Sequence, residues 1–297
     1  MSTALRLPEW FRHSGGKLKA TRQLSATLEA EVPNSICQEA KCPNRSECFS
    51  KGVLTFMIMG TICTRNCGFC SVAHGKPLPP DTKESETIIS AIEKLNLRFV
   101  VLTSPNRDDL KDNGSGHFAF IVREIKKNMP HVKVEVLIPD FQGNKQDLAT
   151  VVEARPDVIN HNMETVSSLY RTVRRGSLYQ RSLGVLKSIK EIDPTLLSKT
   201  GVMLGLGETE RELSQIFQDI QTAGVDILTL GQYLKPDKNN LEVQRYYHPD
   251  EFITLKEEAL ALGIPYVFSG PLVRSSFLAE TVFEDLIRKE SHVHSAD

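Results

Sequence analysis

Short apolar runs alternate with longer mixed segments along most of this chain. Each apolar run indicates a buried strand, and the mixed segments space their apolar residues as one face of a helix does. The predicted strands cover residues 54–59, 99–103, 132–138, 158–160, 201–204 and 227–230, and the predicted helices cover residues 85–95, 116–128, 145–154, 182–191, 208–223 and 250–262. Alternating strands and helices predict a parallel sheet with helices outside it, which is an α/β fold.

The two ends of the chain do not follow this alternation. Pro8, Gly15 and Gly16 interrupt any long element near the start, and residues 31–52 are rich in cysteine and proline. We therefore predict an N-terminal extension over residues 1–52, a central domain over residues 53–262 and a C-terminal extension over residues 263–297.

Composition and charge narrow the class of protein. The chain has 297 residues, of which 40% are hydrophobic and 25% are charged, as in a globular protein with a full core. No apolar run reaches the roughly 18–20 residues of a membrane span. A formal net charge of −1 gives no general attraction for nucleic acid. The first ten residues lack an apolar signal segment, so we expect a cytoplasmic protein.

The six cysteines form two triplets, and short separations of this kind suit iron–sulfur clusters that keep one iron without a cysteine. Structural zinc is an alternative, because His74 can complete the second triplet as a Cys3His site. Disulfides are disfavoured without an oxidising compartment. The triplets are Cys37, Cys42 and Cys48, followed by Cys63, Cys67 and Cys70.

The second triplet stands in the sequence Cys63-Thr64-Arg65-Asn66-Cys67-Gly68-Phe69-Cys70. It resembles the C-x3-C-x-aromatic-C signature of the radical S-adenosylmethionine superfamily. The resemblance implies a partial (β/α)6 TIM-like barrel and a [4Fe–4S] cluster whose free iron chelates S-adenosylmethionine. One electron then cleaves the sulfonium to a 5′-deoxyadenosyl radical, and Phe69 lies against the adenine.

The first triplet, ahead of the second, resembles the arrangement in the lipoyl synthase family. Further matching words follow in order between about residue 31 and residue 280. They are Cys37-Gln38-Glu39-Ala40-Lys41-Cys42-Pro43-Asn44, Thr55-Phe56-Met57-Ile58-Met59-Gly60, Arg107-Asp108-Asp109-Leu110, Asn160-His161-Asn162-Met163-Glu164-Thr165, Gly205-Leu206-Gly207-Glu208-Thr209 and Gly270-Pro271-Leu272-Val273-Arg274-Ser275-Ser276-Phe277.

Several polar residues follow predicted strands, where sites form in parallel α/β folds. Asn106 follows the second strand, Asn162 and Glu164 the fourth, and Gln232 and Tyr233 the sixth. All are candidate contacts to the cofactor. The Asn-His-Asn-x-acid word resembles one in biotin synthase, which implies that Glu164 binds the ribose hydroxyls with help from Asn162. An Asx turn before a helix is the alternative.

Two further roles come from the family resemblance. Arg174 is a candidate contact to the methionyl carboxylate, for which a guanidinium is suited. A serine of the Arg-Ser-Ser-Phe word is expected to ligate the auxiliary cluster on the first triplet, and we choose Ser276 over Ser275. A solvated basic face and a helix N-cap are the alternatives. Arg171, Arg174 and Arg181 are also candidate docking charges for an acidic partner.

The resemblance implies an enzyme of lipoate biosynthesis that inserts sulfur at C6 and C8 of an octanoyl chain on a lipoyl carrier domain or H-protein-like substrate. The auxiliary [4Fe–4S] cluster is the expected sulfur donor. Expected partners are a reductant protein and an iron–sulfur assembly or repair factor, without nucleic acid or membrane, and a monomer is expected. An RNA methylthiotransferase and a ferredoxin-like carrier or zinc scaffold are the alternatives. A carrier normally has every iron ligated by cysteine.

Overall fold

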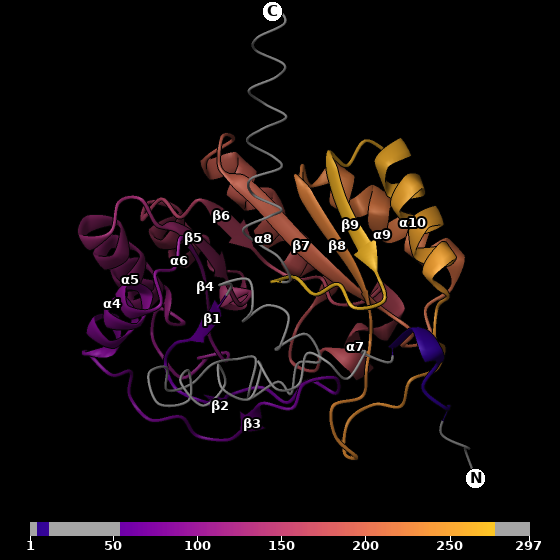
Figure 1. The fold of residues 1–297 in the computed structure, drawn as a ribbon, viewed down its shortest axis with the longest axis horizontal. Helices are drawn as coiled ribbons and strands as arrows, with labels where there is room; N and C mark the ends of the chain where they lie inside the picture. The colour runs from indigo at the N-terminus through magenta and orange to yellow at the C-terminus, as the bar shows by residue number, and fades with distance from the viewer. Residues whose placement is uncertain (1–4, 12–53, 277–297) are drawn as a thin grey trace, which may run out of the picture.

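Residues 5–11 and 54–276 are described by the computed structural model, whose main feature is one parallel sheet (Figure 1). Its spatial order is β1-β4-β5-β6-β7-β8-β9, which follows the chain. The strands are β1 (Leu54–Met57), β4 (Phe99–Thr103), β5 (Lys133–Leu137), β6 (Val158–Asn160), β7 (Leu197–Leu204), β8 (Ile227–Gln232) and β9 (Tyr266–Gly270).

Helices cover the outer face of this sheet. Figure 1 shows α4, α5 and α6 along one half of the sheet and α9 and α10 along the other. The helices are α4 (Glu84–Lys94), α5 (Ser115–Asn128), α6 (Lys145–Val152), α7 (Tyr170–Val173), α8 (Tyr179–Ile192), α9 (Glu210–Thr222) and α10 (Pro249–Ala261), with short 3-10 turns at η1 (Glu9–Phe11), η3 (Phe141–Gly143) and η4 (Ser167–Leu169). The architecture confirms the predicted α/β class and agrees with a partial TIM-like barrel.

All six predicted strands are present, and the sheet has one strand more than the pattern predicted. The additional strand β9 pairs in parallel with β8. Strand β7 also begins at Leu197, ahead of the predicted start at Gly201. Its first residues include Ser198, Lys199 and Thr200, whose polarity does not indicate a buried strand.

A buried ion pair explains how these polar residues enter the sheet. Lys199 Nζ lies 2.9 Å from a carboxylate oxygen of Glu135 on β5, and both side chains are 1% exposed. The Asn160 amide donates to the same carboxylate at 3.1 Å. Val134 and Val136, on either side of Glu135, belong to the core under the helices. Because side chains alternate along a strand, Glu135 points to the opposite, inner face of the sheet.

The central strands are therefore buried on both faces. The outer face packs against the helices in one large cluster. The inner face has a smaller apolar cluster around Phe99, Val101, Val158 and Ile227. Both faces being covered is typical of parallel sheets. This burial leaves the carboxyl ends of the strands as the place where polar side chains converge.

Two short segments extend this framework. Strands β2 (Ile62–Cys63) and β3 (Ala73–His74) pair in parallel beside the end of β1. The turn η1 packs its Trp10 and Phe11 rings against His248 and Tyr246, at centroid distances of 5.1 and 5.7 Å. No helix in the described parts of the chain is long and apolar enough to cross a membrane.

Candidate active site

The second cysteine triplet lies on a loop, residues 60–75, that leaves the end of β1. Cys63 Sγ accepts the backbone N–H groups of Arg65 and Asn106, each at 3.3 Å. Cys70 Sγ accepts the N–H of Val72 at 3.5 Å. All three cysteines are free thiols, as expected. Hydrogen bonds to the sulfurs are a means by which proteins tune iron–sulfur clusters, so this loop is suited to hold one.

The described side chains do not form the zinc site that the sequence offered as an alternative. Within residues 5–11 and 54–276, no three His, Cys, Asp or Glu side chains converge on a single metal ion. His74 is exposed on β3. In a [4Fe–4S] cluster each cysteine binds a different iron, so the sulfurs stand farther apart than around one zinc ion. The described residues therefore give no support to a Cys3His zinc site.

Burial of the loop suppresses thiolate formation. It raises the pKa of Cys67 to about 12 and the pKa of Cys70 to about 11, and the nearby negative charge of Glu164 adds to both effects. These thiols are therefore neutral at pH 7 when no cation is near them. Ligands of this kind lose their protons when iron binds.

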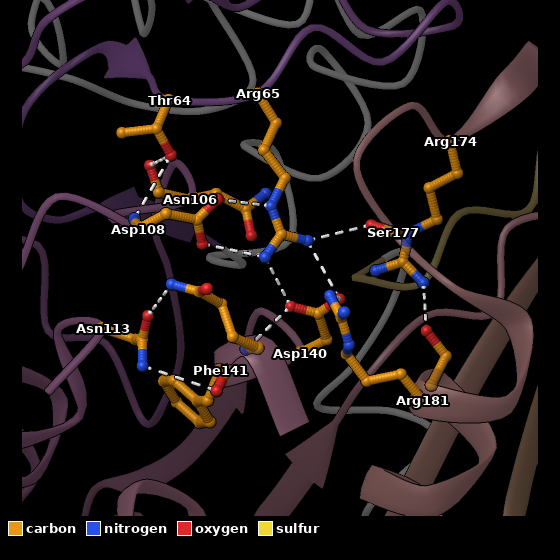
Figure 2. A network of polar contacts seen from close by, with 12 residues as sticks. Thr64, Arg65, Asn106, Asp108, Asn113, Asp140, Phe141, Arg174, Ser177 and Arg181 are labelled. Carbon is orange, nitrogen blue, oxygen red and sulfur yellow. Dashed lines mark hydrogen bonds and ion pairs between the residues drawn. The ribbon is translucent and has the colours of Figure 1, made fainter. Parts of the chain in front are cut away.

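Arg65, inside the same loop, anchors the loop to the barrel (Figure 2). Its Nε and Nη2 donate to Asp108 at 2.6 and 2.8 Å, and its Nη1 and Nη2 donate to Asp140 at 2.9 and 2.7 Å. Nη1 also donates to Ser177 Oγ at 2.9 Å. All five guanidinium N–H groups are used. Asp108 follows β4 and Asp140 follows β5, so one side chain joins the cysteine loop to two strand ends.

Charge stabilises this anchor in a buried position. Burial by itself raises the pKa of Asp140, but the hydrogen bonds and charge of Arg65 more than offset it and hold that pKa well below its usual range. Sequence reasoning did not single out Arg65. The available signal was the Arg-Asp-Asp word at 107–109, to which no role was assigned.

All three cysteines line one cavity of about 240 Å³ at the carboxyl ends of the strands. Three of its polar atoms are buried without a hydrogen-bond partner in the described structure: Ser104 Oγ, Asn106 Oδ1 and Asn162 Oδ1. Such atoms are rare, because an unpaired buried polar group costs stability. A polar ligand beside the cysteines would satisfy them, and the amino-acid and ribose groups of S-adenosylmethionine have suitable chemistry.

Glu164 is held at the cavity in an unusual backbone conformation. Its φ is 65°, in the left-handed region. Its N–H donates to the carbonyl of Gly201 and its carbonyl accepts from Met203, both at 2.8 Å, which fixes it to β7. Asn162 Nδ2 donates to the Glu164 carboxylate at 3.0 Å. Burial raises the pKa of Glu164, although Arg174 and Asn162 oppose the shift. Strained backbone of this type concentrates at functional sites.

A second cavity, of about 420 Å³, shares five residues with the first: Phe69, Cys70, Leu137, Asn162 and Glu164. Phe69 packs here against an apolar cluster that includes Tyr233, Val173 and Leu206. Tyr233 donates its hydroxyl to the carbonyl of Leu241 at 2.9 Å, which leaves its ring as apolar surface. Flat apolar surface of this kind suits a nucleobase.

Ser275 and Ser276 also line the second cavity. The preceding residues cross β8 at Gly231, where a Cβ would lie 2.0 Å from the carbonyl oxygen of Val273. The glycine thus allows the Arg-Ser-Ser segment to reach the cavity. Ser275 Oγ lies 3.2 Å from Asn162 Nδ2. Cys37, Cys42, Cys48 and Phe277 lie outside the described residues.

Two predicted cofactor contacts already have protein partners. The Gln232 amide donates to the carbonyls of Leu204 and Arg245, both at 2.9 Å, and accepts the N–H of Tyr247 at 3.0 Å. Arg174 Nη1 donates to the Asn162 carbonyl at 2.7 Å. Both residues still line a cavity, so their contacts to the cofactor stay predictions.

The prediction that Arg171, Arg174 and Arg181 are docking charges for an acidic partner is partly wrong. Arg174 is buried, and Arg181 binds Asp140 at 3.4 Å. Only Arg171 of that group is exposed.

Comparison with known proteins identifies the family of this chain. A profile of the Radical SAM superfamily matches residues 57–220. A lipoyl synthase of Alkaliphilus metalliredigens is 48% identical over 94% of this chain and 96% of its own length. The lipoyl synthase of Caldanaerobacter subterraneus subsp. tengcongensis is 49% identical over 93% and 96% of the two chains. This chain belongs to the lipoyl synthase family.

Solved structures support the fold alone. The Streptococcus suis protein SuiB bound to its precursor peptide SuiA has a TM-score of 0.58 at 12% identity, covering 85% of this chain and 53% of that one. The hydrogenase maturase HydG has a TM-score of 0.56 at 12% identity, covering 73% and 56%. The features that place this chain in the lipoyl synthase family therefore come from its own sequence and not from these structural neighbours.

We expect Arg65→Lys to weaken both the fold and the cysteine loop. A lysine keeps the charge but cannot bridge two carboxylates bidentately, so Asp140 stays buried with a poorer partner. The free energy of unfolding in urea should fall by about 2–4 kcal/mol, and the iron bound by the second triplet should decrease. Arg211→Lys, on an exposed helical position, is the matched control. Equal stability of the two variants would contradict the anchoring role.

Proposed function

We propose that this protein inserts two sulfur atoms, at C6 and C8, into an octanoyl chain amide-linked to a lysine of a lipoyl carrier domain. The observation that carries the proposal is that the two cavities share Phe69, Cys70, Asn162 and Glu164. One cavity contains the second cysteine triplet, and the other contains the Arg-Ser-Ser segment. A substrate carbon between them has access to both reaction partners.

Cys63, Cys67 and Cys70 would hold a [4Fe–4S] cluster with one iron free for S-adenosylmethionine. When bound there, the cluster and S-adenosylmethionine supply the electron and the organic radical that remove hydrogen from an unactivated carbon. The protein binds and orients the reactants. Glu164 and Asn162 bind the ribose hydroxyls, Phe69 and Tyr233 flank the adenine, and the apolar walls exclude water. Asn106, Arg174 and Gln232 complete the predicted cofactor contacts.

The sulfur source is proposed to be a second cluster on Cys37, Cys42, Cys48 and Ser276. Each insertion replaces one C–H bond with one C–S bond and consumes one S-adenosylmethionine, so each product consumes two. The donor cluster loses sulfide and needs an assembly or repair factor, and a reductant protein supplies electrons. We propose that the enzyme works as a cytoplasmic monomer on a carrier domain or H-protein-like substrate.

The direct test uses protein reconstituted without oxygen, reduced with dithionite and incubated with S-adenosylmethionine and an octanoyl-lysyl peptide. Mass spectrometry should detect a peptide with two added sulfur atoms, preceded by a protein-bound intermediate with one. Cys67→Ala should abolish both species, because it removes a ligand of the radical-forming cluster. Formation of 5′-deoxyadenosine without any sulfur in the peptide would contradict the assigned substrate.

Glu164→Gln should weaken S-adenosylmethionine binding about 10-fold or more, since hydrogen bonds to a charged group contribute ~1.5–3 kcal/mol. Equilibrium dialysis of the reconstituted protein measures the Kd. Glu210→Gln makes the same chemical change at an exposed position of α9 and should leave the Kd unchanged. An unchanged Kd in Glu164→Gln would exclude the ribose role.

Ser276→Ala should leave cleavage of S-adenosylmethionine intact and reduce sulfur insertion, because it removes a ligand from the donor cluster only. Ser275→Ala makes the same chemical change at the neighbouring position and is the matched control. It removes the hydroxyl that lies 3.2 Å from Asn162 Nδ2. Product analysis measures 5′-deoxyadenosine and thiolated peptide side by side. Normal thiolation by Ser276→Ala, with loss in Ser275→Ala, would transfer the ligand role to Ser275.

A further inference from the structure

A cleft of about 420 Å³ is lined by the cysteine loop together with residues that line neither of the two cavities described above. None of the barrel residues Asn106, Asn162 and Glu164 lines it. Its walls come only from the loop itself, from Arg175 and from the segment after β8: Asn66, Cys67, Gly68, Cys70, Ser71, Val72, Ala73, His74, Asp237, Asn239, Asn240 and Leu241. Several of these side chains, including His74 and Arg175, are exposed, so the cleft faces solvent.

The wall between this cleft and the inner cavity is one loop thick. Cys67 and Cys70 line both the cleft and the 240 Å³ cavity. Cys67 Sγ lies 4.0 Å from the backbone carbonyl oxygen of Arg175 at the exposed side. A partner in the cleft therefore approaches two of the predicted cluster ligands without entering the space where S-adenosylmethionine and the acyl chain are expected.

The cleft is held in place by hydrogen bonds. Asn240 Nδ2 donates to the carbonyls of Gly68 and Cys70 at 3.2 and 2.8 Å. The N–H of Leu241 donates to the same Gly68 carbonyl at 3.0 Å, and the N–H of Gly68 donates to Val173 at 2.8 Å. A Cβ on Gly68 would lie 2.9 Å from the Leu241 side chain. The surface is thus preorganised, which lowers the cost of binding a partner.

Positive charge is available at the rim. Arg175 lines the cleft and is exposed, and Lys238 is exposed between the lining residues Asp237 and Asn239. Asp237 is the one carboxylate among the described residues that line the cleft, so the two cations outnumber it. Glu242, beyond the lining residues, forms an ion pair with Lys235. The exposed cations favour a partner with an acidic contact surface, because complementary charge speeds encounter and selects the partner.

We propose that this cleft docks the protein that supplies electrons to the cluster, a one-electron donor with an acidic rim around its redox centre. The inference rests on the proposed function, which requires one electron for each S-adenosylmethionine cleaved. One electron leaves the donor and reduces the cluster by one charge, and no bond of the chain forms or breaks. The thin wall at Cys67 and Cys70 gives this electron a short path.

The carrier domain fits this cleft less well than the donor does. Its acyl chain must bring carbon atoms into the inner cavities, and the residues expected to hold the reactants there, such as Asn162 and Glu164, do not line the cleft. An electron needs only close approach of the two redox centres. The geometry therefore assigns the cleft to the electron donor and the mouth of the barrel to the acyl chain.

The test compares the reconstituted wild-type protein with the charge-reversed variant Arg175→Glu/Lys238→Glu. The probe is an acidic flavodoxin in its hydroquinone form. Isothermal titration calorimetry measures its Kd, and stopped-flow absorbance measures how fast it reduces the cluster. Reversing two rim charges should raise the Kd at least about fivefold and slow cluster reduction, with a smaller difference at high salt. Lys187→Glu/Lys256→Glu, on exposed positions of α8 and α10, should behave as wild type.

Cleavage of S-adenosylmethionine with dithionite as the electron source distinguishes a failure of the docking proposal from a failure of the proposed function. Dithionite is small and needs no docking surface, so the charge-reversed variant should cleave S-adenosylmethionine with dithionite at the wild-type rate. If wild-type protein cleaves none with dithionite, the proposed function fails, while the binding measurement still decides the docking surface. If the double variant does not retain its cluster, Lys238→Glu alone provides the same comparison.

Two results would overturn the docking assignment. One is an unchanged Kd and an unchanged rate of cluster reduction in the charge-reversed variant. The other is weaker binding of the octanoylated carrier domain with unchanged binding of flavodoxin, which would make this cleft the carrier's surface.

Discussion

The hydrogen bonds and ion pairs of the Arg65 guanidinium are the constraint on which the site depends. The loop that carries Cys63, Cys67 and Cys70 has little regular structure of its own, with only the two-residue strands β2 and β3. Arg65 ties this loop to Asp108 and Asp140, which stand at the ends of neighbouring parallel strands. Its guanidinium matches two carboxylates at once, which a lysine cannot do. The cysteine positions therefore inherit the rigidity of the sheet.

The same sheet directs the remaining groups to one place. Parallel strands end together, so residues that follow β4, β6, β7 and β8 meet around the cavities. Glu164 occupies a left-handed position between hydrogen bonds to Gly201 and Met203. Without the β7 partner, that conformation would be costly for a glutamate. The hydrogen bonds to β7 thus offset the backbone strain at Glu164 and fix the position of its carboxylate.

The cysteine loop separates two kinds of surface. Toward the barrel, it faces unpaired polar atoms and aromatic rings that suit S-adenosylmethionine. Toward solvent, it forms a polar cleft with exposed cations. A radical reaction needs water excluded from its reacting carbon, whereas its electron supply must come from outside. One loop with two lined faces meets both requirements, because only the electron has to pass between them.

The sequence by itself determined the α/β class, six of the strands and the place of the second cysteine triplet after the first strand, because apolar periodicity and cysteine spacing are local signals. Strand β9 and the start of β7 were not predicted. Lys199 is stable in β7 only because Glu135, far away in the sequence, faces it. The role of Arg65 and the backbone partners of Gln232 were also decided by tertiary structure alone. A hydrogen-bond partner brought close by folding leaves no periodic trace in the chain, so only the packed barrel reveals it.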